Sequence, residues 1–262
     1  TIVDADDRGV VNGFRLMKAI RKDTCLVCAM STNNETGVVQ NMSHIASVCE
    51  RKGVPLHMDA TQAIGHFPLD ISSLKGECSL SFSGHKFHAP KGVGCLVNSK
   101  TGMNPILYGG MQENGIRAGT ENVAGIVGMA IALEEAYQEN FWDKHLRLIR
   151  GYFIKELNEK VGGVVINGDC SKGIPHILNV SFHNVQGDAL VSMLSDLHEV
   201  YCSTGSSCES GYKKPSRILK SMGFSDERAL SAVRFSFSRY TTIHEIDYTI
   251  NSIGKTLKRL RG

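Results

Sequence analysis

The sequence predicts an α/β fold in which a mainly parallel sheet is followed by a smaller α+β unit. Short, continuously apolar segments alternate with helical segments in the first part of the chain, as they do in parallel sheets covered on both faces. A long helical stretch from 121 to about 159 marks a change of domain, and short strands with a final amphipathic helix follow it. We therefore expect a large domain over 1–130 and a small C-terminal domain over 131–262.

The elements of the first part can be assigned in order from their apolar spacing. Helical spacing predicts helices over 14–21 and 42–52. Apolar runs predict strands over 24–30 and 54–59, followed by strands over 79–83 and 92–98. The second of these strands ends at Asp59, and the third leads directly into a glycine-rich turn that carries Lys86.

The second part contains shorter strands and two more helices. We expect strands over 164–167, 177–183 and 232–238, a strand that reaches Cys202, and a helix over 188–197. The last helix is opened by Thr242 and Glu245, which form a capping-box pattern. One apolar stripe then continues along it, typical of a helix packed on a core; it is formed by Ile246, Ile250, Ile253, Leu257 and Leu260.

Composition narrows the functional class. The chain has 262 residues, of which 42% are hydrophobic and 21% are charged, values typical of a globular protein. A net charge of +3 favours no polyanionic partner, so we expect no direct nucleic-acid binding. No apolar run approaches the roughly 20 residues that span a bilayer, and no signal peptide opens the chain. These features predict a cytoplasmic protein without membrane contact.

The eight cysteines follow no disulfide spacing, and most lie in apolar runs, so we expect reduced, buried thiols. Cys25 and Cys28 form a C-x-x-C pair within a strand that reads as buried. Positions three apart on a strand point to opposite faces, and no second C-x-x-C completes a zinc site. We therefore expect no metal. Cys208 differs, because small and polar residues surround it, and we expect it to be exposed and mobile, unlike the other seven.

Lys86 and Asp59 form the main chemical pattern of the chain. In α/β sheets ligands gather at the carboxyl ends of the strands, where both residues are expected. A lysine can hold the aldehyde of pyridoxal phosphate as a Schiff base, and an aspartate can pair with the pyridine nitrogen. Taken alone, a lysine in a glycine-rich loop is usually a solvated surface residue, and an aspartate at a strand end is usually a turn former.

Five motifs occur in a fixed order along the chain. They are Asn33-Asn-Glu-Thr-Gly37, Asp59-Ala-Thr-Gln62, Ser83-Gly-His-Lys86, Arg117-Ala-Gly-Thr-Glu-Asn122 and Gly205-Ser-Ser-Cys208. Together they resemble the cysteine desulfurases of the nitrogen-fixation and iron–sulfur type, a branch of the class V aminotransferase-like pyridoxal phosphate enzymes. The resemblance implies the aspartate aminotransferase-like fold with an incomplete large domain, because members carry a further third of chain before the point where this one begins.

The resemblance implies a role for each motif residue. Lys86 would bind the cofactor and remove the Cα proton of the substrate. Thr120 would reach the phosphate in the neighbouring subunit, which implies a homodimer. The implied cofactor-binding set is Asn34, Asp59, Gln62, Ser83, His85, Lys86 and Thr120.

The resemblance also implies the substrate and the sulfur chemistry. Arg234 and Asn34 would bind the carboxylate of L-cysteine, a task suited to a guanidinium fork. The thiolate of Cys208 would attack the substrate sulfur and carry it as a persulfide, leaving alanine. The acceptor would be an iron–sulfur scaffold or a tRNA-thiolation protein.

Several alternatives remain open at this point. A selenocysteine lyase or cysteine-sulfinate lyase would share Lys86, Asp59 and Arg234 and depend less on Cys208. A plain aminotransferase has no use for a mobile cysteine. The chain could also be a fragment, or a separate chain could complete it. The non-enzymatic alternative is a truncated, pyridoxal-free remnant that serves as an interaction partner.

Overall fold

The computed structural model describes residues 1–98, 103–138, 141–169, 171–205 and 214–262. The chain forms two compact units. The parallel-sheet unit comprises 13–31 and 41–139, and the C-terminal unit comprises 1–12, 32–40 and 140–262. The expected boundary between 130 and 131 falls within a helix of the parallel-sheet unit, so the expected two-domain division stays a prediction.

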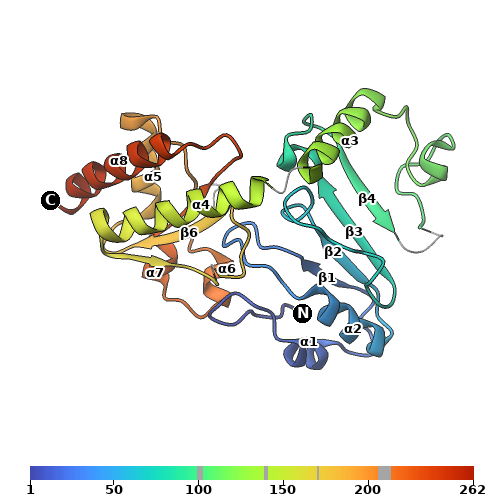
Figure 1. Cartoon of the computed structure of the whole chain (residues 1–262). Helices are drawn as coiled ribbons and strands as arrows, with labels where there is room; N and C mark the ends of the chain where they lie inside the picture. The colour runs from blue at the N-terminus through green and yellow to red at the C-terminus, as the bar shows by residue number, and fades with distance from the viewer. Residues whose placement is uncertain (99–102, 139–140, 170, 206–213) are drawn as a thin grey trace. The chain divides into compact units, whose positions relative to one another are not determined.

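The parallel-sheet unit is built on four strands in the order β1-β2-β3-β4 (Figure 1). The first two pairings are parallel and the third is antiparallel, which confirms a mainly parallel arrangement. The strands are β1 (Val27–Met30), β2 (Leu56–Asp59), β3 (Cys78–Ser83) and β4 (Gly94–Asn98). The helices are α1 (Gly13–Ala19), α2 (Met42–Lys52) and α3 (Val123–Gln138), with 3₁₀ turns at Gly84–Phe87 and Gln112–Gly115.

Local signals explain why α2 has the predicted bounds. The side chain of Asn41 accepts a hydrogen bond from the His44 N–H, as an N-cap residue does. Gly53 ends the helix in the left-handed conformation, with φ of 63°. The expected apolar face, Ile45, Val48 and Cys49, is buried.

The sheet corrects one expectation about the cysteines. Leu56, Met58 and Leu80 are buried, but the side chains that alternate with them are partly exposed. Cys25 and Cys28 are both exposed, so the prediction of a buried β1 is wrong. β1 is an edge strand of the described sheet, and Val27, Ala29 and Met30 beside Cys28 are themselves only half-buried.

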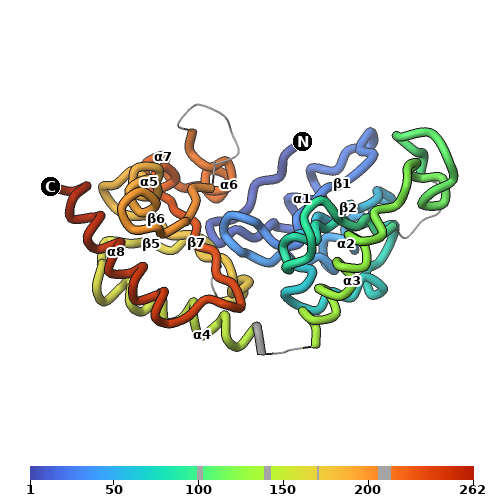
Figure 2. Tube along the Cα trace, turned by 90° about the horizontal axis from the view of Figure 1, so that it is seen from above, coloured from blue at the N-terminus to red at the C-terminus, as the bar shows by residue number. Residues whose placement is uncertain are grey.

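The C-terminal unit has a three-stranded antiparallel sheet in the order β5-β6-β7. Its strands are β5 (Val164–Ile166), β6 (Ile177–Phe182) and β7 (Ala232–Ser236). Its helices are α4 (Phe141–Glu156), α5 (Gly187–His198), α6 (Arg217–Ser221), α7 (Asp226–Leu230) and α8 (Ile243–Arg261), and a π-helical turn (Leu157–Val161) extends α4. Figure 2 shows α4 and α8 lying side by side, in agreement with their contacts.

Three secondary-structure expectations for this part need correction. The helical stretch expected from 121 to 159 is two helices, α3 and α4. The strand expected to reach Cys202 is only an isolated bridge between Ser203 and Arg234. The short helices α6 and α7 were not predicted, because five residues carry too little periodicity to recognise.

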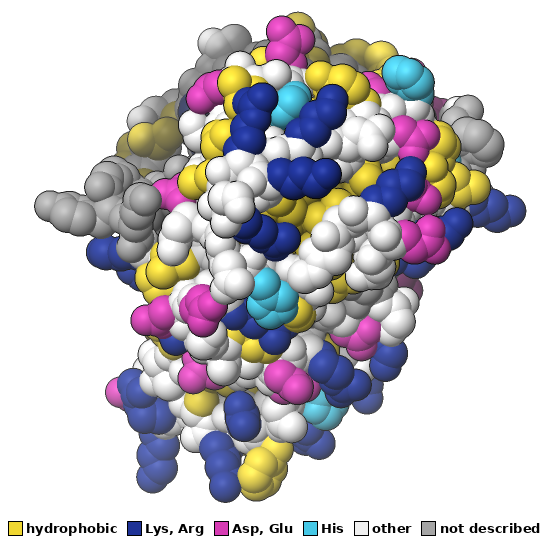
Figure 3. Space-filling model, turned by 90° about the vertical axis from the view of Figure 1, so that its left-hand side faces the viewer, with side chains coloured by type: hydrophobic (Ala, Val, Ile, Leu, Met, Phe, Trp, Pro, Cys, Tyr) yellow, Lys and Arg dark blue, Asp and Glu magenta, His cyan; other side chains and the backbone are white. Residues whose placement is uncertain are grey.

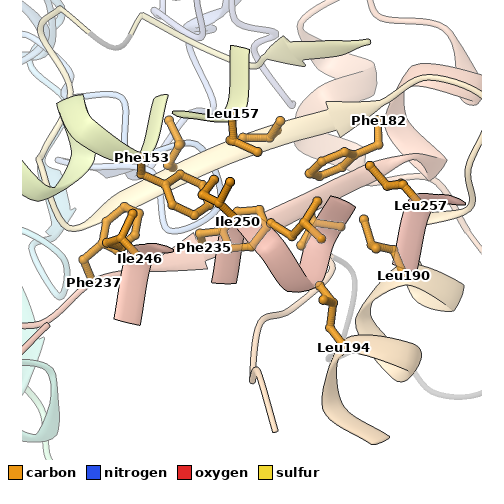
Figure 4. Packing of buried hydrophobic residues seen from close by; sticks show 14 of the residues in the cluster. Phe153, Leu157, Phe182, Leu190, Leu194, Phe235, Phe237, Ile246, Ile250 and Leu257 are labelled. Atoms are coloured by element: carbon orange, nitrogen blue, oxygen red, sulfur yellow. The ribbon is translucent and has the colours of Figure 1, made fainter. Parts of the chain in front are cut away.

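Aromatic packing forms the core of the C-terminal unit (Figure 4). The ring of Phe153, fully buried on α4, lies 4.9 Å from that of Phe235 and 5.4 Å from that of Phe237. The predicted stripe of α8 packs onto this cluster through Ile246, Ile250 and other buried apolar residues. This packing fixes the position of β7, the strand that carries Arg234.

The predicted capping box of α8 is present. The Thr242 N–H donates to Glu245 Oε2 at 2.7 Å, and the Glu245 N–H donates to Thr242 Oγ1 at 3.2 Å. Lys258, Arg259 and Arg261 occupy the last turn, where the helix macrodipole favours positive charge. Figure 3 shows Lys and Arg side chains, interspersed with acidic ones, on the face toward the C-terminus. Among the described residues, no helix meets the length and hydropathy needed to cross a bilayer.

Candidate functional site

Lys86 lies on a 3₁₀ turn directly after β3. The Gly84 N–H donates to the Val93 carbonyl at 3.0 Å, and the Ala89 N–H donates to the Gly84 carbonyl at 3.2 Å. Phe87 is buried and anchors the turn, whereas His85 and Lys86 are exposed. The turn therefore presents the lysine amine to solvent from a fixed backbone.

His66 holds the same turn from the other side, and the sequence patterns did not reveal it. Its Nε2–H donates to the Lys86 carbonyl at 3.2 Å. Burial lowers the pKa of His66 to about 4, aided by repulsion from His88 and Lys86 and opposed by the hydrogen bond to the Lys86 carbonyl. The ring is thus neutral near pH 7. The only sequence signal was a histidine after Gly65 in the turn that follows Asp59, which has no characteristic spacing.

Asp59 lies at the end of β2, the strand next to β3. Its Oδ1 accepts a hydrogen bond from the Thr61 N–H at 2.9 Å, and its carbonyl accepts one from the Ser31 N–H at 2.8 Å. Asp59 is in register with Ser81 on the parallel neighbour β3. The two parallel strands therefore end at the same edge of the sheet. Asp59 is the last residue of β2, and the turn that carries Lys86 follows the neighbouring end of β3.

The other predicted residues of this unit occupy the same turns or a separate loop. Gln62 is buried in the turn that follows Asp59, and Ser83 is the last residue of β3. Thr120 is exposed and follows Gly119, whose φ is 108°. It lies apart from these strand ends in the chain, just before α3.

Arg234 and Asn34 are brought together in the C-terminal unit. Arg234 Nη1 donates to the Asn34 carbonyl at 3.1 Å, so the contact uses the main chain of Asn34. Arg234 Nε is buried and has no hydrogen-bond partner within the described part of the chain. A buried, unsatisfied guanidinium N–H is costly and is suited to an anionic ligand. Cys208 lies outside the described residues.

Asn33 shapes the turn that contains Asn34. Its Oδ1 accepts hydrogen bonds from the N–H groups of Glu35 and Thr36, both at 2.9 Å. The Asn33 N–H donates to the Val38 carbonyl at 2.9 Å. This side-chain turn explains why asparagine stands at the start of the motif, a role that the sequence analysis did not assign.

Comparison with known proteins gives consistent results. The model of the family "Aminotransferase class-V" matches residues 1–249. The chain is 41% identical over 257 residues to cysteine desulfurase IscS of Pectobacterium atrosepticum, covering 97% of this chain and 62% of that protein. It is 38% identical over 265 residues to cysteine desulfurase IscS of Dictyoglomus turgidum, covering all of this chain and 66% of that protein. The chain thus spans less than two thirds of the length of these relatives.

A solved structure described as a NifS-like protein superimposes with a TM-score of 0.89 at 35% identity, covering 99% of this chain and 68% of that one. A structure described as SspA in complex with cysteine superimposes with a TM-score of 0.77 at 28% identity, covering 92% of this chain and 67% of that one. These similarities confirm the expected fold class. The chain belongs to the class-V aminotransferase family.

Proposed function

We propose that the protein containing this chain is a cysteine desulfurase, which converts L-cysteine to L-alanine and transfers the sulfur to Cys208. The observation that carries this proposal is the placement of Asp59 and the Lys86 turn at the ends of adjacent parallel strands. The cysteine desulfurases similar to this chain support the choice of reaction within the family.

The residues at this sheet edge fit pyridoxal phosphate, the cofactor of the family. Lys86 offers an exposed primary amine, Asp59 a carboxylate for the pyridine nitrogen, and Gln62 an amide for the phenolic oxygen. Ser83 and His85 supply donors for the phosphate. When bound, the cofactor supplies an electron sink for charge at the substrate Cα.

Three residues of the chain carry out the steps of the proposed reaction. Arg234 holds the substrate carboxylate through the donors that protein groups leave unsatisfied, with Asn34 beside it. The Lys86 amine removes the Cα proton. The Cys208 thiolate attacks the substrate sulfur, and the bond between Cβ and sulfur breaks with its electron pair on Cβ, which leaves a persulfide on Cys208. Protonation of Cβ and return of the proton from Lys86 to Cα then yield alanine.

The surface of the parallel-sheet unit supports a homodimer. Ile106, Tyr108 and Met111 are 80–90% exposed, and Val123 on α3 is 65% exposed. Exposed apolar side chains that lie together are a feature of protein–protein interfaces. Thr120 lies between these groups along the chain, which agrees with a role at the partner's phosphate. We include in the proposal a cytoplasmic location and a sulfur acceptor, either an iron–sulfur scaffold or a tRNA-thiolation protein.

The first test is a visible absorption spectrum of the purified chain with added pyridoxal phosphate, beside Lys86→Ala. We expect a yellow absorption band from the Schiff base between Lys86 and the cofactor, and we expect the Lys86→Ala variant to lack this band. Sulfide release from L-cysteine follows, and Cys208→Ala should abolish it. Activity on selenocysteine that survives Cys208→Ala would favour the lyase alternative, and absence of the band in both proteins would show that this chain alone does not hold the cofactor.

The role of Arg234 has its own test. Arg234→Gln removes the guanidinium group. We expect the KM for cysteine to rise about 10- to 100-fold, because a change of this size corresponds to the loss of one or two charge-assisted hydrogen bonds to the substrate carboxylate. Arg147→Gln is the matched control, because Arg147 is exposed and pairs with Asp143, four residues earlier on α4. Equal KM values for the two variants would contradict the assignment.

A further inference from the structure

Glu35 lies in a turn whose main chain is held from two sides. Its N–H donates to Asn33 Oδ1 at 2.9 Å, and its carbonyl accepts from Asn179 Nδ2 at 3.2 Å. Asn179 is fully buried on β6, and its Oδ1 accepts from Asn167 Nδ2 at 2.7 Å. Because buried amides in a satisfied network are rigid, the Cα of Glu35 has a fixed position.

The Glu35 carboxylate contacts two residues that are 11 positions apart. Its Oε2 accepts a hydrogen bond from Ser216 Oγ at 2.6 Å. The Ser216 hydroxyl in turn accepts from the Leu219 N–H at 3.2 Å and caps α6. A Cβ placed on Gly205 would lie 2.0 Å from the same Oε2, so the carboxylate packs directly against the Gly205 main chain.

Gly205 and Ser216 are the residues on either side of the segment 206–215, which contains Cys208. The approach to Gly205 is also held by β7, because Ser203 and Arg234 exchange main-chain hydrogen bonds of 3.1 and 2.6 Å. The carbonyl next to Glu35, that of Asn34, accepts from Arg234 Nη1. One turn therefore contacts the substrate-binding arginine and both flanks of the cysteine segment.

We propose that Glu35 is a positioning residue that ties both flanks of the segment 206–215 together beside Arg234. Holding the ends of a ten-residue segment at one point lowers the conformational entropy that its thiol loses on reaching the substrate. A carboxylate is suited to this role because a charged acceptor strengthens the hydrogen bond from Ser216. The inference rests on the proposed role of Cys208.

The test is limited proteolysis of the full chain by trypsin, with mass spectrometry to follow cleavage after Lys213, inside the tied segment. We expect Glu35→Ala to raise the rate constant of this cleavage about tenfold, the factor that corresponds to one lost hydrogen bond. Glu35→Gln retains an acceptor oxygen and should stay within about threefold of the parent. Gly205→Ala displaces the carboxylate and should act like Glu35→Ala.

Two comparisons separate this role from a general loss of stability. The double variant Glu35→Ala/Gly205→Ala should be cleaved no faster than either single variant, because both remove the same contact. Ser216→Ala should accelerate the cleavage, whereas Ser225→Ala should not. Ser225 is a matched control, since it caps α7 by accepting from the Arg228 N–H and removes an equivalent helix cap.

Equal cleavage rates for Glu35→Ala and the parent, or equal acceleration by Ser225→Ala, would overturn the proposal. The assay needs neither cofactor nor cysteine, so its readout stays intact if a preparation that binds pyridoxal phosphate releases no sulfide from cysteine, which is the outcome that would refute the proposed function. In a preparation that does release sulfide, we expect Glu35→Ala to lower kcat about tenfold and leave the KM for cysteine within about twofold. A raised KM with unchanged kcat would contradict the inference.

Discussion

Phe153 is the residue whose removal should most weaken the support of the Arg234 strand. Its side chain is fully buried, and its ring lies 4.9 and 5.4 Å from the rings of Phe235 and Phe237. Phe153→Ala removes these contacts and leaves a cavity that a core bounded by α4, α8 and the sheet cannot fully close. We expect a loss of about 3 to 5 kcal/mol in the free energy of unfolding. Phe153→Leu, which keeps most of the volume, should cost about 1.5 kcal/mol.

Equilibrium urea unfolding followed by circular dichroism measures this loss. Leu148→Ala is the matched control, because Leu148 lies on the same helix but is 59% exposed. We expect it to change the free energy of unfolding by no more than about 0.5 kcal/mol. A loss below about 1 kcal/mol for Phe153→Ala, or similar losses for the two alanine variants, would refute the view that this aromatic cluster holds β7.

Two further predictions concern the Lys86 turn. Gly65 and Gly53 both have left-handed φ angles, of 80° and 63°, but a Cβ on Gly65 would lie 2.5 Å from Phe87 Cβ, whereas one on Gly53 would meet nothing within 4 Å. Gly65→Ala should therefore cost about 2 kcal/mol more than Gly53→Ala in thermal unfolding, and equal costs would contradict the contact. The depressed pKa of His66, about 4 against 6.5, means that the unfolded chain binds a proton first as the pH falls. The parent protein should therefore lose free energy of unfolding as the pH falls from 6.5 to 4, by about 2 to 3 kcal/mol more than the His66→Gln variant loses. Parallel profiles of unfolding free energy against pH for the two proteins would refute this.

The secondary structure of this chain was predictable where the signals are local. The bounds of α2 follow from an asparagine N-cap and a glycine C-cap, and the start of α8 follows from its capping box. The exposure of Cys28 was not predictable, because an apolar strand sequence does not reveal whether a second layer covers it. The short helices α6 and α7 were missed for the same kind of reason, since each is stabilised by its cap and its packing, not by periodicity.

In the candidate site, too, residues within sequence motifs were predictable, and contacts between remote residues were not. The motifs identified Lys86 and Asp59 as candidate site residues, and their positions at strand ends follow from strand assignment. Arg234 came from the resemblance, and it lies within β7. Glu35 stood within a recognised motif but received no role, because its partner is 181 residues away in the chain. His66 was missed because a single histidine in a turn has no characteristic spacing.

The sequence by itself determined the longer helices and strands, because these depend on neighbours within a few positions. It also determined the family, through motifs in a fixed order, and the residue types available for chemistry. Tertiary structure alone decided which atoms meet. It brought Arg234 to the carbonyl of Asn34 across 200 residues, and it brought one carboxylate to both flanks of the cysteine segment. Such contacts arise from long-range strand pairing and core packing, and no local pattern of residues encodes the distance between two side chains that are remote in the chain.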